Sequence, residues 1–199
     1  MATMKEFIEK AQNVNLYDSM EFRRLCRELD VQRGTGASRM CAIFPAERMV
    51  IKVPRMESCR EDYCEREMKN YESAKQYRVE CILLPTTFIG ENTRGCKMYA
   101  QPMYDSAMCD FRGRKCDRMV EKLHGLQDVE RQAKIREGCF DYWRINRYWC
   151  ARVTQLYGKK FMRSFEKWTH FAKVNDLHEG NVGWLNGKPI ILDYAGYCG

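Results

Sequence analysis

The chain has 199 residues, of which 45% are hydrophobic and 31% charged, and its formal net charge is +7. This composition is that of a globular protein with one sizeable core or two small ones, and it excludes collagen-like and low-complexity chains. No apolar run reaches the length of about 18 residues that a membrane span needs, and the first residues lack the apolar stretch of a secretion signal. We therefore expect a cytoplasmic protein that does not enter a membrane.

The first fifty residues predict helices followed by a hairpin. Residues 3–12 and 19–29 have the apolar spacing of amphipathic helices. Residues 33–38, Arg-Gly-Thr-Gly-Ala-Ser, predict a turn because two glycines disfavour a helix. Residues 40–44 and 49–53 are short apolar runs around a Pro-containing turn, which predicts two antiparallel strands.

The remainder of the chain predicts helices and two further strand pairs. Residues 58–76 have helical period, and residues 81–89 and 96–101 read as strands joined by a Gly-rich turn. Residues 106–174 look helical, and the chain closes with two apolar runs around Asn186-Gly187, a strong hairpin signal. Because strands and helices do not alternate regularly, we expect an α+β fold.

The cysteines and the basic residues do not identify a ligand. The chain has 11 cysteines but no C-x-x-C, so the spacing favours free thiols in a reducing compartment over zinc. The densest basic cluster predicts a solvated helix face rather than a nucleic-acid site, because no nucleic-acid motif accompanies it. The cluster is Arg112, Arg114, Lys115, Arg118 and Lys122.

Three residues near the C-terminal hairpin form the strongest chemical signal. Asp176 and Asn181 lie five positions apart in Asp-Leu-His-Glu-Gly-Asn, and Asp193 follows the apolar run of the hairpin. Phosphoryl transfer from ATP needs one carboxylate to orient the attacking hydroxyl, and an amide oxygen and a second carboxylate to hold Mg²⁺. Each residue could instead cap a turn, but a carboxylate directly after a buried strand needs a partner.

This segment resembles the catalytic and metal-binding segments of the protein-kinase-like superfamily. Its sequence motif is similar to that of the early protein kinases of short-tailed bacteriophages and to that of the aminoglycoside and choline phosphotransferases. The resemblance extends over residues 31–197 and implies ATP and Mg²⁺ as ligands. It also implies that Asp176 is the catalytic base and that Asn181 and Asp193 bind the metal.

The resemblance assigns upstream residues to the nucleotide. Lys52, in Val-Ile-Lys-Val, matches the lysine that pairs with the α- and β-phosphates. Gly34, Thr35 and Gly36 match two of the three glycines of the phosphate loop and the residue between them. On their own, the lysine could protect a sheet edge and the glycines could form an ordinary turn.

The following helix and strand should supply the remaining elements. Glu67 is the expected partner of Lys52, and Glu65 and Glu72 are alternatives on the same helix. Gln101 to Met103, at the end of a predicted strand, match the hinge that binds adenine.

The chain also departs from the family pattern. Val174 and Asn175 replace the usual His-Arg, so regulation through a phosphorylated activation loop is not expected. Arg39 occupies the place of the third loop glycine, where it could help bind phosphates or fill their space. Few residues follow Asp193, so the substrate platform is expected from residues 106–174, the N-terminal helices, a second copy or a partner protein.

We therefore expect a reduced bilobal protein-kinase-like fold. Residues 1–30 would be a helical extension, 31–103 the N-lobe and 104–199 a shortened helical C-lobe. The favoured function is that of a Ser/Thr protein kinase, phage-encoded and acting on host proteins. A small-molecule phosphotransferase and a kinase-shaped binding module without turnover are the alternatives.

Overall fold

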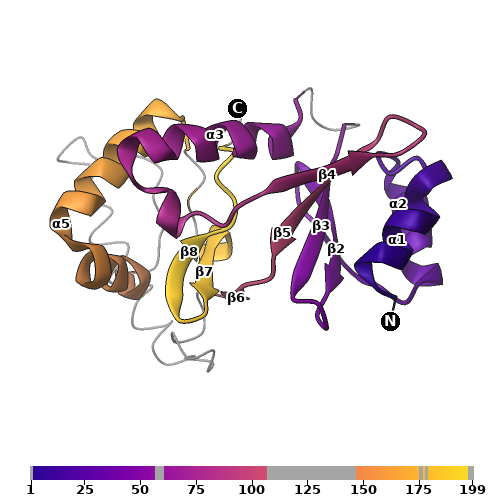
Figure 1. Ribbon diagram of the computed structural model, residues 1–199, viewed down its shortest axis with the longest axis horizontal. Coiled ribbons are helices and arrows are strands. Elements are labelled where there is room, and N and C mark those ends of the chain that lie inside the picture. Colours follow the sequence, from indigo (N-terminus) through magenta and orange to yellow (C-terminus); the bar gives the residue numbers. More distant parts are fainter. Residues whose placement is uncertain (1, 57–60, 107–146, 175–176, 178, 197–199) are drawn as a thin grey trace. The chain divides into compact units, whose positions relative to one another are not determined.

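The computed structural model describes residues 2–56, 61–106, 147–174, 177 and 179–196 (Figure 1). It contains helices and antiparallel sheets, which confirms the α+β class. The helices are α1 (Met4–Lys10), α2 (Ser19–Glu28), α3 (Tyr63–Tyr77) and α5 (Arg147–Phe171), with 3-10 turns η1 (Ala11–Asn13), η2 (Glu80–Ile82) and η3 (Glu179–Asn181). The strands are β1 (Gln32–Thr35), β2 (Arg39–Phe44), β3 (Met49–Pro54), β4 (Thr87–Glu91), β5 (Lys97–Pro102), β6 (Asp105–Ser106), β7 (Val182–Leu185) and β8 (Lys188–Ile191).

The chain divides into two compact units. Unit 1 comprises Met1–Met68 and Pro85–Met103, and unit 2 comprises Lys69–Leu84 and Tyr104–Gly199. The division falls inside α3, so that this helix contributes residues to both units. The expected boundaries at residues 30 and 103 differ from this division. Residues 1–30 fall in unit 1 rather than in a separate extension, and Lys69–Leu84, expected in the N-lobe, fall in unit 2.

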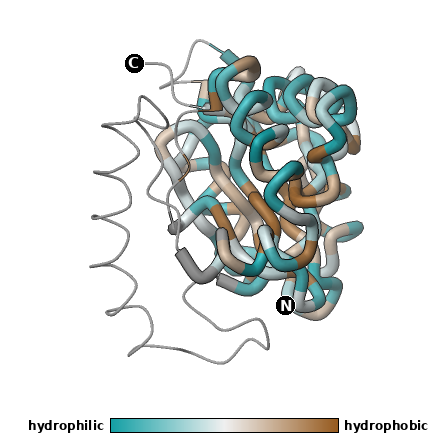
Figure 2. Tube along the Cα trace, turned by 90° about the vertical axis from the view of Figure 1, so that its left-hand side faces the viewer, coloured by the Kyte–Doolittle hydropathy of each residue, from teal (hydrophilic) through white to brown (hydrophobic). Residues whose placement is uncertain are grey.

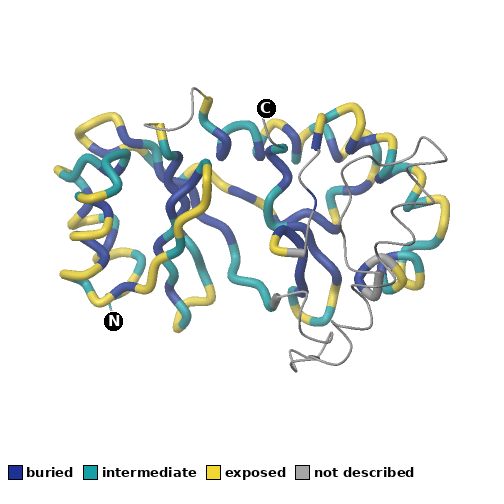
Figure 3. Tube along the Cα trace, turned by 180° about the vertical axis from the view of Figure 1, so that it is seen from behind, coloured by how far each residue is buried: buried dark blue, intermediate teal, exposed yellow. Residues whose placement is uncertain are grey.

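Unit 1 is built on a five-stranded sheet in the order β1-β2-β3-β5-β4, with antiparallel neighbours. β3 lies at its centre, paired with β2 and β5, and its buried positions are dark blue in Figure 3. β1 forms where a turn was expected over residues 33–38. Backbone pairing of Gly34 with Cys41 and of Thr35 with Met40 offsets the weak strand propensity of glycine, and only residues 36–38 remain a turn.

Residues 1–30 belong to the core of unit 1 instead of forming a separate extension. A capping box between Thr3 and Glu6 begins α1, and the Asp18 carboxylate caps α2 by accepting two backbone N–H groups. Each helix buries one side. Along the described chain in general, short hydrophilic and hydrophobic stretches alternate (Figure 2). Phe7 and Phe22 pack edge to face with centroids 6.2 Å apart, in one cluster with the apolar side chains of β2, β3 and β5.

Unit 2 contains a three-stranded sheet in the order β6-β7-β8 and the long helix α5. The predicted hairpin is present: Asn186 and Gly187 both have positive φ, 51° and 74°, as a type I′ turn requires. α5 is kinked at Gly158, where φ is 81°. Its predicted apolar stripe lies in the core with Phe165 and Trp168 fully buried. The expected helical region before residue 147 lies outside the described residues.

The strand predicted over residues 81–89 is wrong in its first half. Residues 80–82 form the turn η2, and β4 starts only at Thr87. Leu83 and Leu84 are buried, and the Leu84 N–H donates to the Ile191 carbonyl oxygen at 2.7 Å. A short apolar run satisfies a strand and a buried connection equally well, so periodicity does not separate the two.

Cys26 and Cys64 behave as buried apolar side chains. Cys26, Cys41, Cys64, Cys81 and Cys96 form no disulfide. Burial raises the pKa of the Cys26 thiol to about 11 and that of Cys64 well above its usual value, so both stay protonated at neutral pH. None of the helices in the described part of the chain combines the length and hydropathy needed to cross a bilayer.

Candidate functional site

Lys52 lies in the middle of the unit 1 sheet. On β3 it is paired with Cys41 of β2 and Tyr99 of β5, and its side chain is only 5% exposed. The Lys52 Nζ donates to both carboxylate oxygens of Glu67, at 3.3 Å and 3.0 Å. A buried ammonium needs such a partner, because the energetic cost of losing water is otherwise not recovered. The sequence-predicted pairing of Lys52 with Glu67 is therefore present.

Glu67 is positioned by the way α3 begins. The Asp62 Oδ1 accepts the backbone N–H of Cys64 at 2.9 Å and of Glu65 at 3.0 Å, which is the geometry of an N-cap. The Asp62 Oδ2 accepts the Tyr99 hydroxyl at 2.6 Å, so the cap is fastened to β5. Burial, and then the neighbouring Asp62 carboxylate, raise the pKa of Tyr99, so the hydroxyl keeps its proton and remains a donor.

Lys97 adds a second connection between β5 and the first turns of α3. Its Nζ donates to the Glu65 Oε2 at 3.1 Å. Glu65, the first alternative partner for Lys52, is therefore engaged with Lys97. Glu72, the second alternative, is exposed and accepts from Lys75 three positions further along the helix. Glu67, in contrast, accepts from the Lys52 ammonium through both of its carboxylate oxygens.

Three further polar side chains complete a buried network around Glu67. The Arg39 guanidinium donates to its Oε1, and the Thr86 hydroxyl donates to its Oε2 at 2.8 Å. Gln101 in turn donates through Nε2 to the Thr86 Oγ1 at 3.1 Å. All five residues are buried, and Glu67 is fully inaccessible. Both carboxylate oxygens thus receive charge-assisted hydrogen bonds, which fixes the position of the anion inside the unit.

Arg39, Thr86 and Asp62 are site residues whose partners sequence reasoning did not find. The sequence pattern marks Arg39 only as a residue at a position where glycine is usual, and Thr86 gives no signal beyond being polar after an apolar run. Asp62, in contrast, lies inside the segment predicted to be helical and opens the pattern Asp-Tyr-Cys-Glu, a recognisable N-cap signature. Its bond to Tyr99 depends on how the helix approaches the sheet, which no local pattern encodes.

The segment of Gly34, Thr35 and Gly36 forms the end of β1 and the start of the turn to β2. The Gly36 N–H donates to the Arg39 carbonyl oxygen at 2.8 Å, and Arg55 Nη1 donates to the Gly36 carbonyl oxygen at 3.1 Å. Neither glycine has a positive φ, and an added Cβ would meet its nearest atom at 3.8 Å and 3.7 Å. The fold of unit 1 therefore tolerates a side chain at both positions.

The expected hinge residues are partly engaged within unit 1. The Gln101 side chain points into the buried network, and the Met103 N–H donates to the Arg48 carbonyl oxygen at 2.7 Å. A purine at this segment would thus meet the Met103 carbonyl oxygen or side chain, since its amide hydrogen is already bonded.

Unit 2 places Asn181 and Asp193 at the same end of the β7–β8 hairpin. Val182 and Ile191 are paired, and the Leu192 N–H donates to the Asn181 carbonyl oxygen at 3.0 Å. The two residues therefore flank one pair of strand ends. Asn181 is buried and Asp193 half-buried, with the Asp193 Oδ1 accepting the Ala195 N–H at 3.4 Å. The expected catalytic residue Asp176 lies outside the described residues.

The hairpin is held firmly by the unit 2 core. Tyr194 is fully buried; its hydroxyl donates to the Leu84 carbonyl oxygen at 2.9 Å, and its own carbonyl accepts from Asn70 at 2.7 Å. Trp149 donates to the Gly183 carbonyl oxygen at 3.1 Å. These bonds hold the backbone directly after Asp193 and the neighbouring strand β7. No group of three His, Cys, Asp or Glu side chains gathers as a metal site among the residues described.

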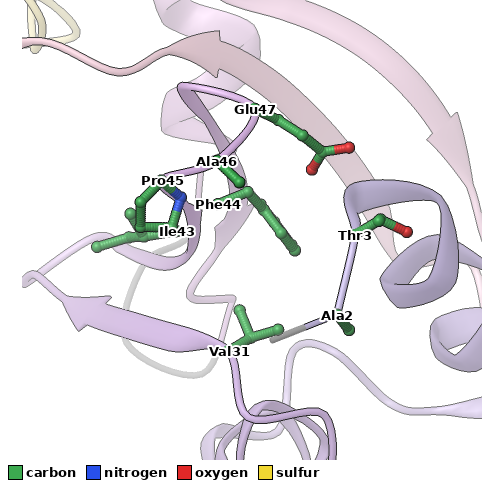
Figure 4. Close-up of a pocket in the computed structure, with 8 residues that line it drawn as sticks. All are labelled: Ala2, Thr3, Val31, Ile43, Phe44, Pro45, Ala46 and Glu47. Carbon is green, nitrogen blue, oxygen red and sulfur yellow. The ribbon is translucent and has the colours of Figure 1, made fainter.

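A small pocket elsewhere in unit 1 does not contain the predicted site. It lies at the β2–β3 turn, against the start of the chain (Figure 4), and is lined by Ala2, Thr3, Val31, Ile43, Phe44, Pro45, Ala46 and Glu47. Glu47 already accepts the Met4 N–H at 2.8 Å. With no basic side chain in its lining, this pocket offers no counter-charge to a phosphate.

None of the protein-family models, curated proteins or solved structures compared with this chain matches it.

Proposed function

We propose that the chain is an ATP- and Mg²⁺-dependent phosphotransferase with a reduced bilobal protein-kinase-like fold, acting as a Ser/Thr protein kinase. The observation that carries the proposal is the buried pair of Lys52 and Glu67. It joins the third strand of an antiparallel sheet to the helix that follows, as the ATP-binding lysine and its helix glutamate do in protein kinases. Catalysis would come from positioning and charge neutralisation.

Each residue of the kinase-like pattern would have one role in ATP binding or phosphoryl transfer. Lys52 would donate to the α- and β-phosphates while Glu67 holds its ammonium in place. Asp176 would accept the proton of the attacking substrate hydroxyl. As it does so, the hydroxyl oxygen would form a bond to the γ-phosphorus, and the bond between the γ-phosphorus and the β–γ bridging oxygen would break. The backbone of Gly34 to Gly36 would approach the phosphates closely, which accounts for glycines that the fold itself does not require.

Asn181 and Asp193 suit a magnesium ion. Carboxylate and amide oxygens are the ligands that Mg²⁺ prefers, and both residues stand at one end of the hairpin. Bound Mg²⁺ would neutralise charge on the phosphates. The proposed phosphate acceptor is a protein in the cytoplasm, which would be the cytoplasm of a bacterial host if the chain is viral. A second copy of the chain or a partner protein would contribute to binding this acceptor.

The test is ATP binding followed by transfer. Saturating ATP with Mg²⁺, at about 100 times Kd, should stabilise the folded chain by about 2.7 kcal/mol, which raises Tm by roughly 5–10 °C. The Asp193→Asn variant should lose the part of this Tm increase that depends on Mg²⁺. Asp30→Asn, an exposed control with the same change of charge, should keep it. No Mg²⁺-dependent shift in the natural chain would contradict the proposal.

Transfer from γ-labelled ATP in a cell lysate then separates the candidate activities. Labelled protein bands support a protein kinase. A labelled small solute supports a phosphotransferase of the aminoglycoside or choline type. A Tm shift without any transfer supports a kinase-shaped binding module.

A further inference from the structure

The C-terminal half of α5 exposes almost only basic side chains. Among residues 159–173, the exposed positions are Lys159, Lys160, Arg163, Lys167, His170, Phe171 and Lys173. The opposite side of the helix is the apolar stripe with Phe165 and Trp168, which lies in the unit 2 core. Solvent therefore meets a basic face, interrupted only by Phe171, which is 61% exposed.

The basic residues are ordered along the helix. With 100° between successive residues, Lys159, Arg163 and Lys167 follow one another on the same side at steps of about 6 Å. His170 continues this row, and Lys160 lies beside it. The row from residue 159 to residue 170 is about 16 Å long. We call these five residues together with Lys173 the basic face of α5.

Five members of the basic face have no acidic partner. In the described part of the chain, no salt bridge involves Lys159, Lys160, Arg163, Lys167 or Lys173. On α1 and α2, by comparison, Lys5 pairs with Glu9 and Arg24 pairs with Glu28, whereas the exposed Lys10, Arg23 and Arg27 form no salt bridge in the described part of the chain. The only acidic residue within α5 is Glu166, which is half-buried. Like charges at i,i+4 destabilise a helix, so this face has an energetic cost that an acidic ligand would remove.

We propose that the basic face of α5 binds an acidic, extended polypeptide segment. In an extended chain, alternate side chains point to one side at intervals of about 6.6 Å, close to the 6 Å steps of the row. Acidic residues at alternate positions could therefore each meet one cation. Charge complementarity of this kind mainly raises the association rate and selects the partner.

A single-stranded nucleic acid fits the face less well. Binding of that kind combines cations with aromatic rings on which successive bases stack. Between residues 159 and 173, Phe171 is the only exposed aromatic residue, and its ring already lies 5.6 Å from that of Tyr77. The face thus offers charge without a row of stacking surfaces.

Fluorescence anisotropy with the full-length protein tests the proposal. The probe is a labelled peptide of alternating Glu and Ser, titrated at low and at physiological salt, with alternating Gln and Ser as its neutral counterpart. The double variant Arg163→Gln/Lys167→Gln should weaken binding about tenfold, since two exposed ion pairs contribute about 1.4 kcal/mol together. Gln has nearly the helix propensity of Lys and Arg, so α5 should remain folded, which far-UV circular dichroism would verify.

The matched control is Lys5→Gln/Arg24→Gln, which removes the same charge from paired residues of α1 and α2. It should change the affinity less than twofold. Equal weakening by both variants would reduce the effect to net charge and overturn the proposal. Tighter binding of a single-stranded oligonucleotide than of the acidic peptide would overturn it in favour of nucleic acid. Failure of the peptide to bind even at low salt would also overturn it, and none of these results depends on ATP.

Discussion

Glu67→Gln should be among the most destabilising substitutions of a polar residue in unit 1. The change keeps the shape of the side chain but removes the negative charge that Lys52 and Arg39 share. Breaking a buried ion pair by removing one partner costs about 3–5 kcal/mol, because the remaining charge stays desolvated. The free energy of unfolding of a domain is only about 5–15 kcal/mol in total. We therefore expect a loss of about a fifth or more of the stability of unit 1.

The assay is urea unfolding followed by two probes. All four tryptophans, at positions 143, 149, 168 and 184, belong to unit 2, so their fluorescence reports unit 2 alone. Far-UV circular dichroism follows both units. Glu67→Gln should lower the midpoint of the circular dichroism transition much more than that of the fluorescence transition.

Glu72→Gln is the matched control on the same helix. Glu72 is exposed and paired with Lys75 at 2.6 Å, and surface pairs contribute at most about 1 kcal/mol. If Glu67→Gln cost no more than Glu72→Gln, the buried network would not stabilise the protein as its geometry indicates. The combined replacement of Glu67, Lys52 and Arg39 by apolar residues of similar volume should recover much of the lost stability, because no charge is left buried.

Three further outcomes follow from contacts described above. Asp62→Ala should cost about 2–3 kcal/mol in urea unfolding, since it removes an N-cap and leaves the buried Tyr99 hydroxyl without its acceptor; a loss below 0.5 kcal/mol, the level of an ordinary surface change, would argue against the tether. The raised pKa of Tyr99 means that its contribution to stability is complete below about pH 10 and is lost as the pH rises above that value, so Tyr99→Phe should flatten the alkaline part of a stability–pH curve. Gly183→Ala should cost at least about 2–3 kcal/mol in unfolding followed by tryptophan fluorescence, because the added Cβ would lie 2.3 Å from the Asp105 carbonyl oxygen. Gly34→Ala should leave stability nearly unchanged by circular dichroism, and it should lower the affinity for ATP if the phosphate proposal holds.

Local sequence signals predicted the secondary-structure elements better than they predicted which residues contact one another in the tertiary structure. Asn186-Gly187 predicted its hairpin because a two-residue turn needs φ > 0 twice. The pairing of Lys52 with Glu67 was predictable because the protein-kinase-like pattern places a lysine on a strand and its glutamate partner on the helix that follows. The partnership of Arg39 with the same carboxylate was not, because it depends on the register of β2 against β3. No position-by-position pattern contains that information.

The same limit explains the error at residues 81–84. The side chains of Ile82, Leu83 and Leu84 are buried, as the apolar composition of the segment indicates, but in unit 2 instead of the unit 1 sheet. The segment finds its backbone partner in Ile191, more than a hundred positions later in the chain. Sequence reasoning weighs neighbours a few residues away, and a contact of this separation is beyond it.

The bond between Leu84 and Ile191 also bears on how the protein is made. During synthesis, every strand of the unit 1 sheet has left the ribosome once residue 102 has emerged. The buried Val79, Ile82 and Leu84 are complete in their packing only after β8 (Lys188–Ile191) has been translated. At about 5–20 residues per second the delay is roughly 5–20 seconds. Throughout that interval the apolar residues between positions 79 and 84 lack the backbone partner that β8 later supplies.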